Sequence, residues 1–308
     1  MADRKIPLLI DTDPGVDDAV AIWLALASPE IELLGLTTVI GNGPVAACAE
    51  NAIRILDAAG RPEIPVHAGA AQPLERSYAR PGWGVHGADG LGGIGLPAPS
   101  RRADGGEAVA YLADTLESAT PGSVTLALLG PLTNVACLLR DRPRARLGIR
   151  EVVIMGGAAA PGGGNATPHA EYNFWIDPEA AALVCASGLP MTLVTIETAR
   201  PVSATPERIA RLEAIGGKVG GYVAGMLRNY VHESGADALF DALVIAYLLH
   251  PGYFPRIPAR IEVLARTSDS PGALDWQPAA PDASQAILQA PDPDAIFDLL
   301  VARLKQLP

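Results

Sequence analysis

The chain has 308 residues, of which 49% are hydrophobic and 19% are charged, and its formal net charge is −11. This length and apolar content can bury one large core, so we expect a single domain over residues 1–308. The acidic balance argues against nucleic acid as a partner, because phosphate binding needs a basic face. No apolar run approaches the roughly 18 residues of a membrane span, and the N-terminus lacks the apolar stretch of a signal peptide.

The three cysteines, Cys48, Cys137 and Cys185, are far apart and set in apolar segments. An odd number of scattered cysteines is typical of reduced thiols, so we expect a cytoplasmic protein with no membrane partner. There is no CxxC pair and no cluster of cysteine with histidine, which disfavours a zinc site.

The first predicted strand and helix enclose an acidic turn. Residues 6–10 form a short apolar run typical of a buried parallel strand, and residues 16–27 continue as an apolar helix after Pro14-Gly15. Four carboxylates lie around this break: Asp11, Asp13, Asp17 and Asp18. Such close carboxylates tolerate burial badly unless a cation or strong donors neutralise them. Because open α/β sheets bind ligands at the carboxyl ends of their strands, the pattern predicts a hard-cation site here.

The rest of the chain alternates strands with helices. The expected strands cover 31–40, 64–67, 124–129, 151–155, 191–196, 257–265 and 284–288, and the expected helices cover 44–59, 107–119, 135–140, 177–187, most of 205–247, and 294–307. This alternation predicts an α/β fold with a mostly parallel central sheet flanked by helices, Rossmann-like, with a smaller helical portion near 200–250. Residues 69–106 are rich in glycine, proline and arginine, and we expect an ordered loop at the active site.

Candidate ligand-binding residues, most of them polar, lie at or after the ends of several predicted strands. The set consists of Asn42, Leu129, Met155, Asn165, His169, Glu171 and Asn173. The geometry of parallel sheets gathers strand ends into one crevice. Carboxylates and amides suit a polyhydroxylated ligand, because each sugar hydroxyl both donates and accepts hydrogen bonds. Oxygen ligands favour Ca²⁺ or Mg²⁺, whose bound water beside a carboxylate base would be a nucleophile near neutral pH.

A series of motifs resembles one known family, the nucleoside hydrolases of the inosine/uridine-preferring N-ribohydrolase type. In order these are DTDPGVDDA (11–19), GN (41–42), HGADGLGG (86–93), LGPLTN (129–134), VIMGG (153–157), NATPHAEYNFWIDPEAA (165–181) and FDALVIAYLLHP from Phe240. They cover about residues 7–250. The resemblance implies the nucleoside hydrolase fold and calcium-dependent cleavage of ribonucleosides to ribose and free base, in nucleoside catabolism or salvage. It also implies a small-molecule partner and a homodimer or homotetramer.

The resemblance also implies roles for individual residues. Asp13 would be both a calcium ligand and the base that activates water, and Asp18, the Leu129 carbonyl and Asp241 would complete the calcium ligands from the protein. The ribose hydroxyls would be held by Asp17, Asn42, Asn165, Glu171 and Asn173, with Met155 lining the sugar pocket. A carboxylate cluster would stabilise the oxocarbenium character that develops on ribose during cleavage.

One position departs from the family pattern. Inosine/uridine-type members carry a histidine immediately before the last calcium-binding aspartate, and it helps protonate the leaving base; here the residue is Phe240. Leaving-group activation would then fall to His86, His169, Tyr230 or His232, or the base would stack on Phe240 or Trp83. We therefore expect an unusual base preference and weak cleavage of uridine.

Two alternatives stay open at this point. One is a Mg²⁺-dependent phosphohydrolase with Asp11 as nucleophile and Asp13 as acid/base, although the downstream lysine is missing and Pro14-Gly15 breaks the pattern. The other is a catalytically weak or inactive homologue that binds ribose or a nucleoside after loss of the acid at position 240.

Overall fold

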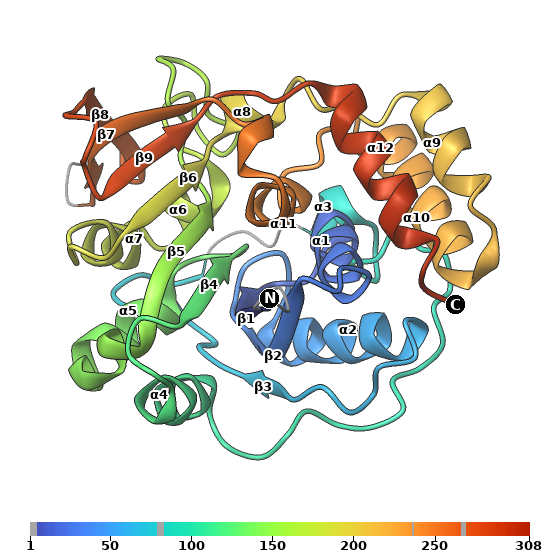
Figure 1. Cartoon of the computed structure of the whole chain (residues 1–308), viewed down its shortest axis with the longest axis horizontal. Helices are drawn as coiled ribbons and strands as arrows, with labels where there is room; N and C mark the ends of the chain where they lie inside the picture. The colour runs from blue at the N-terminus through green and yellow to red at the C-terminus, as the bar shows by residue number, and fades with distance from the viewer. Residues whose placement is uncertain (1–4, 79–82, 236, 266–268) are drawn as a thin grey trace.

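The structure is a computed structural model that describes residues 5–78, 83–235, 237–265 and 269–308. These residues form a nine-stranded sheet with the order β3-β2-β1-β4-β5-β6-β9-β7-β8 (Figure 1). The strands are β1 (Ile6–Thr12), β2 (Ile31–Thr38), β3 (Val66–Ala68), β4 (Val124–Leu128), β5 (Ile149–Met155), β6 (Met191–Val194), β7 (Arg256–Leu264), β8 (Ala273–Pro278) and β9 (Gln285–Leu288). Pairings from β3 through β9 are parallel, whereas β7 runs antiparallel to β9 and β8. The predicted, mostly parallel central sheet is confirmed.

Helices cover both faces of this sheet. They are α1 (Val16–Leu26), α2 (Val45–Ala58), α3 (Trp83–His86), α4 (Ala108–Ser118), α5 (Thr133–Asp141), α6 (Tyr172–Ile176), α7 (Pro178–Cys185), α8 (Ile196–Ala199), α9 (Pro206–Glu213), α10 (Gly217–Asn229), α11 (Ala242–Leu249) and α12 (Pro293–Leu304), with 3₁₀ turns at Pro143–Gly148 and Pro251–Tyr253 and a π-helix at Tyr230–Ser234. Helices α9, α10 and α11 with the π-helix are the helical portion predicted near 200–250. No helix within the described ranges is long and apolar enough to cross a membrane.

The central strands are apolar on both faces, which explains their unbroken hydrophobic runs. Along β1, Leu8 and Ile10 pack into a core that includes side chains of α1, α2, α10, α11 and α12. The intervening residue, Leu9, packs into a second core with side chains of α4, α5 and α7. Because successive residues of a strand point to opposite faces, one short segment contributes to both layers.

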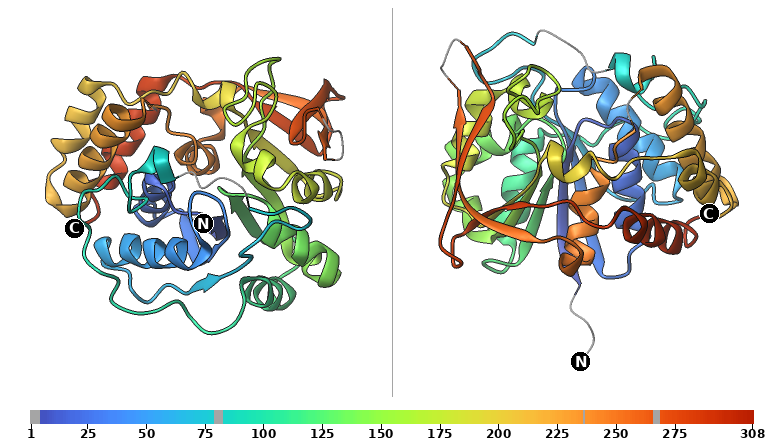
Figure 2. Two further views of the ribbon diagram at one scale, coloured as in Figure 1. Left: turned by 180° about the vertical axis from the view of Figure 1, so that it is seen from behind. Right: turned by 90° about the horizontal axis from the view of Figure 1, so that it is seen from above.

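The C-terminal part of the sheet differs from the prediction. Strand β8 was not predicted, because its sequence, ALDWQP, is largely exposed and has no apolar run. It pairs with β7 to form a hairpin at one end of the molecule, and helices α9, α10 and α12 lie at the other end (Figure 2). The strand predicted to reach Ile196 ends at Val194, since Thr195 is the N-cap of the short helix α8.

Candidate active site

The acidic turn lies where the strand order of the sheet reverses. From β1 the chain proceeds outward through β2 and β3 on one side, while β4, β5 and β6 extend from the other side of β1. Ligands of open α/β sheets bind at this type of switch point, outside the carboxyl ends of the strands. Asp13 follows β1 directly, and Asp17 and Asp18 stand in the first turn of α1.

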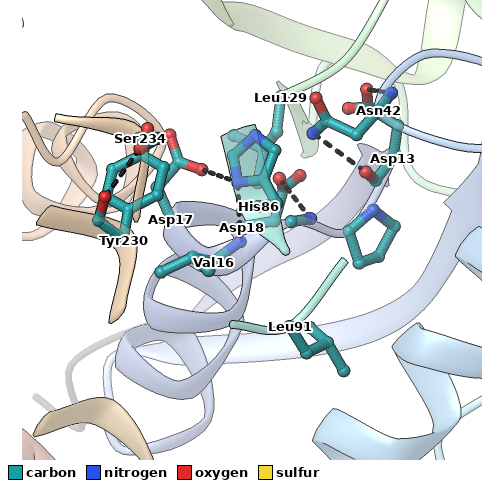
Figure 3. Close-up of polar contacts among 12 residues, drawn as sticks. Asp13, Val16, Asp17, Asp18, Asn42, His86, Leu91, Leu129, Tyr230 and Ser234 are labelled. Atoms are coloured by element: carbon teal, nitrogen blue, oxygen red, sulfur yellow. Dashed lines mark hydrogen bonds and ion pairs between the residues drawn. The ribbon is translucent and has the colours of Figure 1, made fainter. Parts of the chain in front are cut away.

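Three aspartates of this turn differ in how their oxygens are satisfied (Figure 3). Asp18 accepts hydrogen bonds from the Thr12 hydroxyl and, at 2.8 Å, from the Gly15 backbone N–H. Asp13 Oδ2 accepts the Asn42 backbone N–H at 2.6 Å. The other oxygen of Asp13 and Oδ1 of Asp17 are buried without a hydrogen-bond partner among the described residues. Buried oxygens of this kind call for a ligand.

A fourth carboxylate reaches the cluster from the other end of the chain. Asp241 precedes α11, and Asp17, Asp18 and Asp241 each offer an oxygen within 4.8 Å of the others. Burial raises the pKa of Asp241 well above its usual range, and the charges of Asp17, Asp18 and Asp13 raise it further. Burial, followed by the charges of Asp18 and Asp17, likewise raises the pKa of Asp13. The group fits a bound cation, which would remove this repulsion.

A cavity of about 620 Å³ opens above these carboxylates. Its lining consists of Asp17, Asn42, Gly84, Val85, His86, Leu129, Met155, Asn165, Ala166, Glu171, Tyr172, Asn173, Tyr230, Ser234, Gly235, Phe240 and Asp241. Asp13 and Asp18 lie beneath it, with 1% and 0% of their surface exposed. None of these lining residues is a lysine or arginine, so the protein offers no fixed positive charge to the carboxylates here.

Short helix α6 and its N-cap present two of the residues predicted to bind the sugar, Glu171 and Asn173, to the cavity. Glu171 caps the helix and accepts the backbone N–H groups of Asn173, Phe174 and Gly157. Burial raises the pKa of Glu171 to about 7. The Asn173 amide donates to the Leu129 carbonyl at 2.8 Å, which connects α6 with the end of β4.

His86 and Tyr230 form one wall of the cavity. Their rings stack with centroids 5.3 Å apart and planes inclined by 17°. The Val16 backbone N–H donates to His86 Nδ1 at 3.2 Å, which assigns the proton of the neutral ring to Nε2. Burial lowers the pKa of His86 to about 4. A Cβ atom at Gly15 would lie 2.7 Å from this ring, so only glycine permits the close approach.

Of the other residues predicted to contact or activate the base, some line the cavity and others do not. Phe240 lines the cavity, half-buried. His232 is exposed and is not among the described lining residues. His169 is exposed and lines a separate cavity of about 250 Å³ beside β8. Trp83 begins helix α3, but its side chain lies outside the described residues.

Asp11 does not face the acidic cluster. Its Oδ1 accepts hydrogen bonds from the Thr37 hydroxyl and from the Asn134 amide, the latter at 2.7 Å. Asn134 also accepts the Ala70 backbone N–H at 2.8 Å. The sequence alone did not identify this bracing role of Asn134. Oδ1 of Asp11 is occupied as a structural acceptor, which does not favour Asp11 as the nucleophile of a phosphohydrolase.

A mostly parallel α/β sheet, with buried carboxylates and amides at its switch point, fits a hydrolase of glycosidic bonds. The family model for the inosine-uridine preferring nucleoside hydrolases matches residues 8–298. The chain belongs to this family, as its motifs predicted, and is thus a hydrolase acting on N-glycosyl compounds.

Individual relatives agree with this assignment. The pyrimidine-specific ribonucleoside hydrolase RihA of Salmonella gallinarum is 38% identical over 97% of this chain and 98% of its own. A probable uridine nucleosidase 1 of Oryza sativa is 37% identical over 80% of this chain and 78% of its own. A solved purine-preferring ribonucleoside hydrolase from Gardnerella vaginalis superimposes with a TM-score of 0.88 at 26% identity, covering 97% of this chain and 98% of that one.

Proposed function

We propose that this chain is a calcium-dependent nucleoside N-ribohydrolase that releases ribose and a free base by direct attack of water. The observation that carries the proposal is the buried, unpartnered Oδ1 of Asp13 beside the cluster of Asp17, Asp18 and Asp241. Calcium suits the site because it takes six to eight oxygen ligands in flexible geometry, whereas magnesium demands a stricter octahedron. The ion would be held by Asp13, Asp18, the Leu129 carbonyl and Asp241.

The bound ion would polarise water and neutralise the carboxylates. Asp13 accepts a proton from the attacking water while the oxygen of that water bonds to C1′ of the ribose. The C1′–N bond breaks, and its electron pair leaves with the base. The surrounding carboxylates stabilise the positive charge that develops on the sugar. Asp13 can act as this base because its Oδ1 has no hydrogen-bond partner among the described residues, while its Oδ2 is fixed by the Asn42 N–H.

The ribose would be oriented by the polar lining of the cavity. In this proposal its hydroxyls contact Asp17, Asn42, Asn165, Glu171 and Asn173, and Met155 packs against the ring. Most of these side chains are themselves fixed by backbone contacts. Asn42 donates to the Asp13 carbonyl at 3.1 Å, and Asn173 donates to the Met155 carbonyl at 3.2 Å. The sugar therefore meets a preformed set of donors and acceptors.

Replacing Glu171 by glutamine is expected to raise the KM for nucleosides about tenfold. A change of this size corresponds to the free energy lost when a buried hydrogen-bond donor has no acceptor. Both Glu171 oxygens accept backbone N–H groups, and the glutamine NH₂ would face one of those donors. Steady-state kinetics on inosine measure the change. Glu179→Gln is the control, because Glu179 pairs with Arg76 away from the cavity. Equal KM changes in both variants would contradict the assignment of Glu171.

Among the described residues proposed to contact the base, none is a strong general acid. Phe240 cannot donate a proton, and burial, by lowering the pKa of His86 to about 4, keeps that ring neutral near pH 7. Neutral His86 can still donate a hydrogen bond from Nε2. Tyr230, buried against it, is the second candidate. Bases that leave easily, or that stack on Phe240, should therefore be preferred.

Replacing Phe240 by histidine is expected to raise kcat/KM for uridine about 10²-fold, the lower end of the range for general-acid assistance. The rate with p-nitrophenyl riboside should hardly change, because nitrophenolate needs little protonation to leave. Comparing the two substrates in the same enzyme preparation separates acid assistance from a general change in the site. A parallel change for both substrates would contradict the role of position 240.

The proposed function is tested by release of nitrophenol from p-nitrophenyl riboside, with and without chelator. Release that stops with chelator, followed by a panel of inosine, adenosine, guanosine, uridine and cytidine, would support it and define the base preference. Phe240 favours one rival, an inactive homologue that only binds nucleosides. No release, with ribose binding retained in calorimetry, would support that rival.

A further inference from the structure

The Asp13 carboxylate is enclosed by the backbone of two glycines. Its Oδ2 accepts the Asn42 N–H at 2.6 Å, and its Oδ1 has no hydrogen-bond partner among the described residues. A Cβ atom at Gly41 would overlap Oδ2, and one at Gly130 would lie 2.5 Å from Oδ1. With backbone directly against both oxygens, the direction of the carboxylate follows the position of the Gly41–Asn42 peptide.

The carbonyl end of that peptide accepts hydrogen bonds from two tyrosines. The Tyr78 hydroxyl donates to the Gly41 oxygen at 2.5 Å, and the Tyr172 hydroxyl donates to it at 3.0 Å. Tyr78 lies in the loop after β3, whereas Tyr172 is the first residue of α6. Both side chains are half-buried. Two segments far apart in the sequence therefore meet at one carbonyl group.

The Gly41 carbonyl and the Asn42 N–H are the two ends of one planar group. Partial double-bond character keeps this peptide rigid, so a constraint on its oxygen also fixes its N–H. Hydrogen bonds accepted by the oxygen polarise the peptide and strengthen the bond that its N–H donates. Through this peptide, the two hydroxyl groups act on the Asp13 carboxylate without touching it.

We propose that Tyr78 and Tyr172 are positioning residues for hydrolysis, which hold the Gly41–Asn42 peptide and thereby aim Oδ1 of Asp13 at the attacking water. The inference rests on the proposed function, in which Asp13 accepts the proton of that water. Tyr172 also lines the cavity beside Glu171 and so links the helix that binds the sugar to the peptide that holds the base.

Tyr78→Phe is the cleanest test, because Tyr78 is not among the described residues that line the cavity. We expect kcat to fall about three- to tenfold, because the free energy of one hydrogen bond corresponds to a rate change of this size. KM should change less than about twofold. The double variant with Tyr172→Phe should lose more than the product of the two single losses, since in each single variant the remaining hydroxyl partly holds the carbonyl. Tyr111→Phe is the matched control: its hydroxyl donates to the Leu34 carbonyl at 2.8 Å, and its ring is also half-buried.

Kinetics with p-nitrophenyl riboside and urea unfolding of each variant decide the outcome. A loss confined to kcat in Tyr78→Phe, with Tyr111→Phe fully active at similar stability, supports the positioning role. Equal losses of kcat in these two variants, or a loss that appears only in KM, would overturn it. An active wild type that Asp13→Asn inactivates but Tyr78→Phe leaves unchanged would overturn this inference alone. A wild type that releases no nitrophenol would overturn the proposed function and the inference with it.

Discussion

Replacing Asp13 by asparagine is expected to lower kcat for ribonucleosides by about 10³-fold, the middle of the range for loss of a general base. The amide cannot take the proton of the attacking water, although its oxygen can still accept the Asn42 N–H that now bonds Oδ2. The loss should appear in kcat more than in KM, since most of the proposed ribose contacts come from other side chains. Initial rates with inosine and p-nitrophenyl riboside over a range of concentrations measure the effect.

Asp11→Asn is the matched control for this variant. Asp11 is also buried at the end of β1, but its Oδ1 accepts hydrogen bonds from Thr37 and Asn134, which an amide oxygen can accept equally. Its kcat should stay within about threefold of wild type, the size of a small hydrogen-bond change. If Asp13→Asn kept more than a tenth of the wild-type rate, or if Asp11→Asn lost as much activity, Asp13 would not be the base.

The fold of the Asp13→Asn variant should remain intact. Burial, followed by the charges of Asp18 and Asp17, raises the pKa of Asp13, so a neutral side chain suits this position in the metal-free protein better than a carboxylate. We expect its urea midpoint in chelator to equal or exceed that of wild type. An inactive variant that also unfolds more easily would indicate damage to the fold and not loss of a base.

Much of this site could be predicted because its parts follow strand ends. Asp13 and Leu129 come directly after β1 and β4, and Asn42 lies in the turn that follows β2; parallel pairing brings such positions to one edge of a sheet. Apolar runs locate the strands, so the edge can be recognised from local patterns alone. The family motifs then added Asp241, which no local pattern relates to the acidic turn.

The remaining features depend on contacts between segments that carry no regular pattern. The loop that contains Tyr78 and His86 has no apolar periodicity, so its course over the site could not be predicted. Its histidine reaches Val16 only because Gly15 has no side chain, a reason visible only in three dimensions. His169 shows the opposite case: it belongs to a motif that we expected to bind the sugar, but it lines a different cavity.

The second large effect concerns calcium and pH. In the metal-free protein, burial raises the pKa values of Asp13, Asp17, Asp18 and Asp241, that of Asp17 to about 6, and the charges of neighbouring aspartates further raise those of Asp13, Asp18 and Asp241. A carboxyl group with a raised pKa in the folded state stabilises the fold below its unfolded pKa, and that stability is lost as pH rises through the folded value. The melting temperature in chelator should therefore fall from about pH 4 upward, through pH 6 and beyond.

Calcium should reverse this decline, because it binds the ionised carboxylates that the fold alone tolerates poorly. At a concentration 100 times its Kd it would add about 2.7 kcal/mol, or about 5 °C in melting temperature, and more at pH 8 than at pH 5. Calorimetric melting in calcium, magnesium or chelator measures this, and activity should disappear in chelator. Asp241→Asn should lose most of the calcium shift, whereas Asp11→Asn should keep it. A shift that is equal with magnesium, or that persists in Asp241→Asn, would contradict a calcium site built on these carboxylates.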